Sequence, residues 1–395
     1  MIAKDSGDAN RFMRKAVIYV EKFLPASQAF VLNQAVAFRS FEAEILAGSR
    51  ISSAHTKKST VPVHDIRRSP VARAGELLLK IPQVGLPFLF PAISQADLVH
   101  AHFGKNGYVI GPLARAAGKP LVTTFHGFDA TYRGDPKKPG GFNQVRFFAK
   151  GRSEMAGWNS WNIAVSDFIR ERLLALGFRA DRVFRHHIGI DLDLFKMEPR
   201  PRKKGLVVSI ARFVDYKGHR LMIDALSRVA AAGTPVEFVM VGQGPLKEEI
   251  EAMARRSLPS VTIHENLSQT EIRDLLASAE LYLHGSVTLD NGHAEAFGLA
   301  NLEAEAVGTP VVAFRSGGVG EAIEEGKTGY LVEERDVAGM AEAVGKLLND
   351  QALWTAFSAR APLLVAERFD IRRQTGMLED YYSSVLDEFA SRGRT

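Results

Sequence analysis

The sequence has no cysteine and no long apolar run, and each absence excludes a class of protein. Without cysteine there is no disulfide framework, no thiol nucleophile and no cysteine-ligated metal. The longest apolar runs, such as residues 206–211, are far shorter than the roughly 20 residues that a membrane-spanning helix needs. The stretch 1–15 also lacks the apolar segment of a signal peptide. We therefore expect a cytoplasmic protein and leave open a peripheral position on the inner face of the plasma membrane.

The excess of positive charge is small. There are 50 lysines and arginines against 45 aspartates and glutamates, which gives a formal net charge of +5. That excess does not indicate a nucleic-acid partner, and we expect none, but it suits an anionic ligand or an anionic membrane surface. Hydrophobic residues at 46% and charged residues at 24% exclude a disordered or fibrous chain. A length of 395 residues predicts two domains.

Apolar runs alternate with amphipathic stretches along the chain, which is the pattern of parallel sheets covered by helices. The predicted fold class is therefore α/β, with two doubly wound halves separated by a polar run that contains two prolines. We predict an N-terminal domain over 1–189, a linker over 190–204, a C-terminal domain over 205–366 and a C-terminal helix over 367–395. The predicted strands are 16–20, 97–101, 120–125, 161–165, 205–211, 236–241, 261–264, 281–284 and 310–314, and the predicted helices include 28–38, 107–117, 167–176, 220–232 and 246–256.

Two glutamates flank a predicted helix start in the second half. Glu295 lies in a loop, and Glu303 falls in the second turn of a helix that begins near Gly298. The unpaired N–H groups at such a start favour a phosphate, and a glycine lets the backbone approach the ligand closely. Each carboxylate could accept hydrogen bonds from hydroxyl groups on its side of a diphosphate. The alternative is a solvated helix face that carries glutamates by chance.

Two cations follow the predicted strand 205–211. Arg212 and Lys217 lie in the loop after it. Open parallel sheets bind ligands outside the carboxyl ends of their strands, so this loop lies on the binding edge. Arg212 can bind phosphate oxygens through two N–H groups, and Lys217 adds a compact charge. The pair could neutralise a diphosphate leaving group without a metal, although a basic surface loop would give the same pattern.

Histidines mark two strand ends in the first half. His126 follows the predicted strand 120–125, and Asp129 lies three residues later; a structural histidine is the alternative. His100 and His102 alternate on one strand and therefore share one face. Two histidines on one face make a metal site conceivable, but no further ligands lie at convincing spacing, and we expect no metal.

The second half resembles a known enzyme family. The segment from Glu295 to Glu303, followed by Gly308-Thr-Pro-Val-Val, is similar to the E-x7-E region of the retaining glycosyltransferases of family GT4. The stretches Gly317-Gly-Val-Gly-Glu and Gly326-x-x-Gly-Tyr-Leu-Val fit the same family. The order of a strand, an arginine and then Lys-Gly resembles the diphosphate-binding element of that family. In the first half, the turn around Ser27 resembles the Pro-x-x-Ser-x-x-Phe turn of a subgroup that builds extracellular and capsular polysaccharides.

The resemblance implies a GT-B architecture, in which two Rossmann-like domains face each other across a cleft and the C-terminal helix returns to the first domain. The second domain then binds a nucleotide-diphosphate sugar, and the first binds the acceptor. The resemblance implies catalytic roles for His126, Arg212, Lys217 and Glu295, donor contacts from Gly242, Gly244, Asn266, Leu267, Phe297, Gly298, Leu299 and Glu303, and acceptor-side positions for His102, Asp129 and Ser27.

The function implied is that of a retaining hexosyltransferase in cell-surface polysaccharide synthesis. It would move a sugar from a nucleotide-diphosphate sugar to a saccharide or a lipid-linked saccharide, with no cofactor and no metal. A sugar-nucleotide epimerase or phosphorylase on the same fold, or a non-catalytic glycan-binding module, is the alternative. The basic segment 57–80 could dock on anionic lipid, or it could be a solvated charged face.

Overall fold

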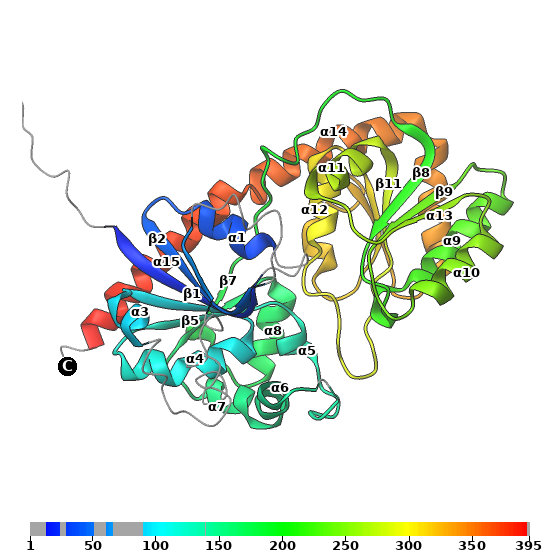
Figure 1. Cartoon of the computed structure of the whole chain (residues 1–395). Helices are drawn as coiled ribbons and strands as arrows, with labels where there is room; N and C mark the ends of the chain where they lie inside the picture. Colours follow the sequence, from blue (N-terminus) through cyan, green and yellow to red (C-terminus); the bar gives the residue numbers. More distant parts are fainter. Residues whose placement is uncertain (1–12, 24–28, 51–60, 66–89, 139, 393–395) are drawn as a thin grey trace, which may run out of the picture. The chain divides into compact units, whose positions relative to one another are not determined.

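The computed structural model describes residues 13–23, 29–50, 61–65, 90–138 and 140–392, and within them the strands form two sheets (Figure 1). Ser27 and most of the basic segment 57–80 lie outside the described residues. The first sheet contains β1 (Arg14–Phe23), β2 (Phe41–Arg50), β3 (Val63–Asp65), β4 (Leu98–His102), β5 (Leu121–Phe125), β6 (Trp161–Ala164) and β7 (Val183–Arg185). The second contains β8 (Lys203–Ile210), β9 (Glu237–Val241), β10 (Val261–His264), β11 (Ala279–His284), β12 (Val311–Phe314) and β13 (Gly329–Val332).

Both sheets have the strand order of a doubly wound fold. The first runs β3-β2-β1-β4-β5-β6-β7 and the second β10-β9-β8-β11-β12-β13. The pairs β1–β2, β1–β4, β8–β9 and β8–β11 are parallel. In each sheet the order reverses between two neighbouring central strands, β1 and β4 or β8 and β11. Ligands of open α/β sheets bind at such switch points.

Helices cover both faces of each sheet (Figure 1). Along β1, Val17 and Tyr19 belong to one apolar core, while Ile18 and Val20 belong to another. This alternation is what a strand with helices on both faces requires. The helices are α1 (Ala29–Val36), α3 (Phe90–Gln95), α4 (Gly104–Ala116), α5 (Phe128–Thr131), α6 (Phe142–Arg146), α7 (Arg152–Ala156), α8 (Asp167–Ala175), α9 (His219–Ala231), α10 (Lys247–Ser257), α11 (Gln269–Ser278), α12 (Leu299–Ala306), α13 (Val337–Asn349), α14 (Gln351–Arg368) and α15 (Ile371–Arg392), with a π-helical turn η4 (Phe147–Gly151) and 3-10 turns η5 (Ala180–Arg182), η6 (Asp215–Lys217) and η7 (Val319–Ala322).

The most distinct departure from the sequence prediction is β2, which was not predicted although it pairs with the central strand β1. Its sequence, FEAEILAGSR, carries two glutamates and looks too polar for a covered strand. Glu44 is nevertheless buried, because it forms an ion pair with Lys15 and contacts His64, whose Nε2 lies 3.0 Å from Glu44 Oε1. A strand that buries a paired charge has no apolar signature along the chain.

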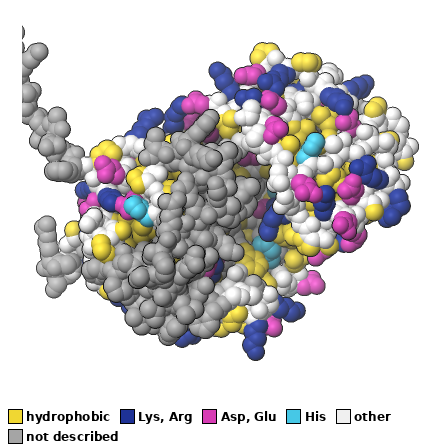
Figure 2. All heavy atoms as spheres, in the orientation of Figure 1, with side chains coloured by type: hydrophobic (Ala, Val, Ile, Leu, Met, Phe, Trp, Pro, Cys, Tyr) yellow, Lys and Arg dark blue, Asp and Glu magenta, His cyan; other side chains and the backbone are white. Residues whose placement is uncertain are grey.

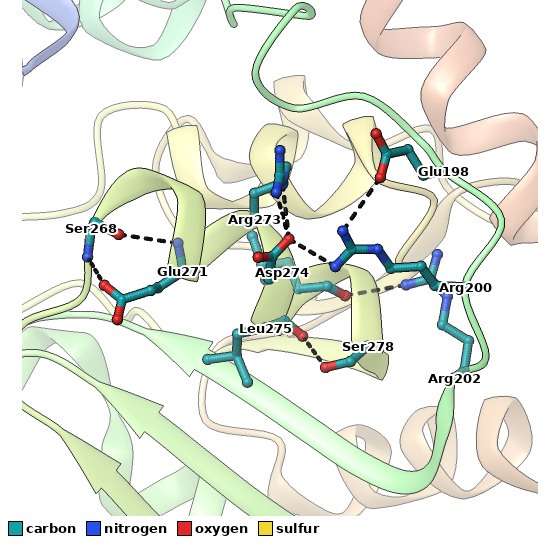
Figure 3. A network of polar contacts seen from close by, with 10 residues as sticks. Glu198, Arg200, Arg202, Ser268, Glu271, Arg273, Asp274, Leu275 and Ser278 are labelled. Atoms are coloured by element: carbon teal, nitrogen blue, oxygen red, sulfur yellow. Dashed lines mark hydrogen bonds and ion pairs between the residues drawn. The ribbon is translucent and has the colours of Figure 1, made fainter.

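The polar run between the two sheets is exposed over residues 196–201, but β8 begins at Lys203, two residues earlier than the predicted strand. Arg202, in the same run, is half-buried and is held by four hydrogen bonds. Its acceptors include Thr309 Oγ1 at 2.6 Å and Val307 O at 2.6 Å. Burial lowers the pKa of Arg202 to about 10. Arg200 binds Asp274 on α11 at 2.8 Å, so two of the basic residues of this run tie it to the second sheet's helices (Figure 3).

The chain forms two compact units: residues 1–124, 141–162 and 375–395 make the first, and residues 125–140 and 163–374 make the second. Within the first unit, Glu379 of α15 accepts hydrogen bonds from the backbone N–H groups of residues 39–41, at 2.6–3.0 Å. The last strand of the first sheet ends at residue 185 and the first strand of the second sheet begins at residue 203, but the second compact unit already includes residues 163–202. The predicted domain boundaries therefore remain predictions. Among the described residues, no helix is long and apolar enough to cross a membrane. On the face drawn in Figure 2, basic and acidic side chains are interspersed.

Candidate active site

The two predicted cations lie just after β8, at the switch point of the second sheet. Arg212 is exposed, and its Nη2 donates to Tyr216 Oη at 3.1 Å. Lys217 ends the turn η6 and forms an ion pair with Glu295. The next residue, Gly218, has a φ of 63° and precedes α9; a Cβ there would lie 1.8 Å from Gly285 O. Only glycine fits this close crossing, which places Lys217 beside the end of β11.

The end of β11 supplies a second set of polar side chains. His284 Nδ1 lies 2.6 Å from Asn301 Oδ1, and His284 Nε2 lies 2.8 Å from Ser286 Oγ. Ser286 in turn donates to Glu295 Oε2 at 3.1 Å. The same carboxylate oxygen also pairs with Lys217. One connected polar network therefore joins the loop after β8, the end of β11 and the first turn of α12.

The surroundings of this network keep Glu295 and Lys217 in their charged forms. Burial acts to raise the pKa of Glu295, but Lys217 and His284 outweigh it and hold that pKa well below its ordinary value. Burial likewise opposes the charge of Lys217, and Glu295 outweighs it, so the pKa of Lys217 is raised. By contrast, burial alone raises the pKa of Glu303 to about 7. The two glutamates of the motif, eight residues apart, therefore differ in charge: Glu295 is ionised at neutral pH, whereas Glu303 takes up a proton near neutral pH.

The helix that follows begins as predicted. Gly298 has a φ of 119° and directly precedes α12, and Glu303 lies in the second turn and is half-buried. Leu299 opens the helix and is also half-buried. Phe297 is 2% exposed, and its ring stacks on His187 with centroids 4.8 Å apart. Its side chain therefore packs in the interior, and only its backbone is available to a ligand.

Two glycines bring the turn after β9 against the Arg212 loop. A Cβ at Gly242 would lie 2.1 Å from Ala211 O, and one at Gly244 would lie 2.3 Å from Phe213 O. Gly242 N also donates to His264 O, at the end of β10, at 2.8 Å. The residues after β10 lie on the same sheet edge, where Asn266 is exposed and Leu267 half-buried.

The second compact unit also contains the predicted His126 turn. Asp129 Oδ1 accepts from the backbone N–H groups of His126 at 3.1 Å and Gly127 at 2.9 Å, so it orients the backbone of this turn. Gly127 has a φ of 130°, and a Cβ there would lie 2.8 Å from Ala296 Cβ. This contact places the His126 turn next to the segment that carries Glu295.

His102 lies in the first compact unit, at the end of β4. It is 1% exposed, and its ring centroid lies 4.4 Å from that of His100, which confirms that the two share one face. Burial lowers the pKa of His102 to about 3, so the ring is neutral at physiological pH. Among the described residues, no group of three histidine, aspartate or glutamate side chains is placed to hold a metal ion.

Sequence reasoning missed five residues of this site. They are His284, Ser286 and Asn301 in the network around Glu295, and Tyr216 and His293, whose rings meet with centroids 4.4 Å apart. Lys217 Nζ lies 5.0 Å from the Tyr216 ring, within the range of a cation–π contact. The signal available for His284 was its position as a polar residue at the carboxyl end of a buried strand.

Comparison with known proteins agrees with the geometry. Residues 32–194 match the family model described as Glycosyltransferase Family 4, and residues 192–363 match Glycosyl transferases group 1. The chain is 25% identical over 379 residues to a colanic acid biosynthesis glycosyltransferase, WcaL, of Escherichia coli strain K12, covering 83% of this chain and 89% of that protein. It is 30% identical over 277 residues to a GDP-mannose-dependent alpha-(1-6)-phosphatidylinositol monomannoside mannosyltransferase of Mycolicibacterium smegmatis, covering 65% of this chain and 69% of that protein.

The fold is also that of solved glycosyltransferase structures. Anabaena Alr3699/HepE, in complex with UDP and glucose, superposes with a TM-score of 0.76 at 20% identity, covering 94% of this chain and all of that one (100%). At this identity the likeness concerns the fold, which is GT-B, as predicted. The family matches and the relatives support glycosyl transfer and not the epimerase, phosphorylase or binding-module alternatives. The chain belongs to glycosyltransferase family 4 and is a glycosyltransferase.

Proposed function

We propose that this glycosyltransferase takes its sugar from a nucleotide-diphosphate sugar bound at the switch point between β8 and β11. The observation that carries the proposal is the ion pair of Lys217 with Glu295, three residues before Gly298 at the start of α12, together with Arg212, which bonds Tyr216 on the same loop as Lys217 at 3.1 Å. Arg212 and Lys217 are the groups we assign to the diphosphate, together with the N–H groups at the start of α12. The UDP bound to HepE supports this class of donor.

In the proposed reaction the bond between the anomeric carbon and the diphosphate oxygen breaks, and a bond forms between that carbon and an acceptor hydroxyl oxygen. The hydroxyl proton leaves with the diphosphate. Negative charge grows on the leaving group as positive charge grows on the sugar, so fixed cations at the diphosphate stabilise the transition state. Each such contact in a site of this kind lowers a barrier by roughly 3–4 kcal/mol. We propose that no metal ion is required.

The remaining roles follow from position. We assign Glu295 to the hydroxyl groups of the donor sugar and Glu303 to the ribose. His126 belongs beside the anomeric carbon, since Gly127 contacts Ala296, the residue after Glu295. Gly242, Gly244, Asn266 and Leu267 lie on the edge where we place the base. We propose that transfer retains the anomeric configuration.

For the acceptor we propose a saccharide or a lipid-linked saccharide, used in the synthesis of a cell-surface polysaccharide. The name of the relative WcaL, a colanic acid biosynthesis glycosyltransferase, supports this assignment. The relative from Mycolicibacterium smegmatis is named for a lipid-borne acceptor, a phosphatidylinositol monomannoside. An anionic membrane surface at the inner face of the plasma membrane remains a proposed partner.

The test is a screen of nucleotide sugars in the presence of EDTA. UDP-glucose, UDP-galactose and GDP-mannose are incubated with the full chain and a membrane lipid extract, and release of nucleoside diphosphate is followed. We expect one donor to be consumed at the same rate with EDTA as without it, and proton NMR of the product to show the donor's anomeric configuration. Restoration of activity by Mg²⁺ or Mn²⁺ after EDTA would contradict metal independence, and inversion would contradict retention.

A further inference from the structure

His284 has no role in the reaction proposed above, yet it lies at the centre of the network. It ends β11 and is 6% exposed. Both of its ring nitrogens have partners: Asn301 Oδ1 at 2.6 Å from Nδ1 and Ser286 Oγ at 2.8 Å from Nε2. The Nε2 atom also lies 3.5 Å from Glu295 Oε2. This histidine is therefore one hydroxyl group away from the carboxylate that we assign to the donor sugar.

The acceptors in this chain of contacts limit where its protons can lie. Asn301 Oδ1 can only accept, so Nδ1 of His284 carries a proton. The single hydroxyl proton of Ser286 can go either to Glu295 Oε2, 3.1 Å away, or to Nε2 of a neutral His284 ring, 2.8 Å away. While Lys217 pairs with Glu295, the carboxylate keeps a donor in either case. All three contacts are satisfied together only when His284 carries a proton on both nitrogens and is positively charged.

We propose that His284 is a positioning residue for Glu295: as a cation it holds the carboxylate through Ser286 when Lys217 turns to the diphosphate of the donor. The inference rests on the proposed function, in which Lys217 serves the leaving group. Without donor, Lys217 forms an ion pair with Glu295. Once the diphosphate attracts Lys217, the half-buried Glu295 carboxylate would be left short of positive charge unless a second cation stays beside it.

The other ionisable groups around His284 agree with this direction. His219, at the start of α9, is 3% exposed, and burial lowers its pKa to about 3, so it stays neutral and adds no competing charge. Tyr282, on the same strand, donates to Ile210 O at 3.2 Å and carries no charge near neutral pH. The nearby Glu303, on α12, helps to raise the pKa of Tyr282 and so to keep it uncharged. Lys217 on η6 is thus the one described cation near His284 whose position we expect to change, and its departure favours the second proton on the ring.

The first experiment measures protons taken up when a nucleotide binds. UDP and GDP are titrated calorimetrically into the full chain at pH 8, in two buffers of different ionisation enthalpy. At this pH the terminal phosphate, with a pKa of about 6, is already ionised and contributes little. We expect net proton uptake by the wild type and none by His284→Gln, which can donate to Ser286 but cannot become charged. Equal uptake by both proteins, or no uptake by the wild type, would overturn the proposal.

The second experiment asks whether His284 acts through Glu295. Rates of nucleoside diphosphate release from UDP-glucose or GDP-mannose are compared for His284→Leu, Ser286→Ala, Glu295→Gln and the double variant His284→Leu with Glu295→Gln. We expect a loss of about 30-fold for His284→Leu and about tenfold for Ser286→Ala, as for other supporting residues of an active site. In the Glu295→Gln background the His284→Leu change should cost less than about threefold, because the group it positions is gone.

Controls separate this role from a structural one. His219→Gln changes a buried histidine whose ring stacks on Phe213 at 4.6 Å, and it should not alter proton uptake. If His284→Leu fails to fold by circular dichroism, His284→Gln and Ser286→Ala decide the test. Equal losses in both backgrounds would show a purely structural role and contradict the proposal. A wild type that neither binds UDP or GDP nor consumes a donor would overturn the proposed function itself. A wild type that binds nucleotide and consumes a donor, while His284→Leu costs the same with and without Glu295→Gln, would overturn this inference alone.

Discussion

The two switch points of this molecule share a topology but differ in net charge. Between β8 and β11 lie ionised groups, with Lys217 paired to Glu295 and the exposed Arg212 beside them. At the end of β4, next to β1, His100 and His102 are buried, and His102 is neutral because its pKa is about 3. The strand order fixes where a ligand can bind, and the residues at the strand ends decide what it is. At the first point Lys105, at the start of α4, pairs with Glu21 of β1, so these two charges cancel. At the second point Arg212 adds a positive charge beyond the pair of Lys217 and Glu295, which suits a diphosphate.

The backbone conformation also differs between the two switch points. The turn after β4 places Phe103 at a φ of 73°, a conformation that is uncommon for a residue with a side chain. At the second point the positive φ values fall on Gly218 and Gly298, which adopt them without strain. The glycines allow loops to cross closely around Lys217 and Glu295, which a side chain would prevent.

The sharpest way to break the comparison is to remove the charge at the second point. We expect Arg212→Ala or Lys217→Ala to lower kcat by about 100- to 1,000-fold, and the double variant by more, because each cation stabilises the leaving diphosphate. The matched control is Arg220→Ala, since Arg220 is a half-buried arginine nearby that pairs with Glu249 at 2.7 Å. Steady-state kinetics of donor consumption measures the effect, and a loss of less than threefold in the double variant would contradict the assignment.

The close crossing at Gly218 predicts a large loss of stability. Gly218→Ala would place a Cβ 1.8 Å from Gly285 O at a φ of 63°, so we expect the free energy of unfolding to fall by about 3 kcal/mol or more. Gly233→Ala is the control, because Gly233 has a φ of 87° but nothing within 4 Å of the added atom. That change should cost only about 1–2 kcal/mol. Urea unfolding compares the two, and equal losses would show that the crossing is not tight.

Acid should destabilise both compact units through buried neutral histidines. Burial lowers the pKa of His102 and of His219 to about 3, below the unfolded value of 6.5. The stability that each provides is complete above pH 6.5 and is lost as the pH falls towards 3. We expect each histidine to cost about 1.4 kcal/mol for every pH unit below 6.5. Thermal melts at pH 5.5 and 7.5 test this, and His102→Gln or His219→Gln should each flatten the dependence; unchanged slopes would contradict it.

The smallest expected effect concerns the first switch point. Tyr382 on α15 contacts His100 Nδ1 through its hydroxyl group, and both residues are buried. Tyr382→Phe removes one buried hydrogen bond and should lower the free energy of unfolding by about 1 kcal/mol. We expect nucleotide affinity to stay unchanged, because the second switch point is untouched. A change in UDP or GDP affinity measured by calorimetry would show that the two points are not independent.

Much of the second half was predictable from sequence because its signals are local. Apolar runs gave β9 and β10 nearly to the residue, and the glycine before α12 marked the start of that helix. What could not be predicted depends on contacts between distant segments. Glu44 is a polar residue in the sequence, and only the folded chain places Lys15 beside it. Arg202 lies in a polar run, and only the folded chain brings Thr309 and Val307 to accept its hydrogen bonds.

The same distinction applies to the site. Arg212, Lys217, Glu295 and Glu303 stand in motifs along the chain, so they could be proposed from the sequence. His284 belongs to no motif, and its place became visible only when α12 brought Asn301 against it. Phe297 was assigned to the donor from the motif, whereas its ring packs on His187, so only its backbone can serve that role.

The most direct measurement is the affinity of the diphosphate group itself, in EDTA. Uridine, UDP, guanosine and GDP are titrated into the wild type and into Arg212→Ala with Lys217→Ala, with chelator present throughout. We expect one diphosphate to bind the wild type at least about 100-fold more tightly than its nucleoside, a gain of about 2.7 kcal/mol, and the double variant to bind both alike. Nucleoside and diphosphate binding the wild type equally, or a diphosphate preference that survives loss of both cations, would contradict the account.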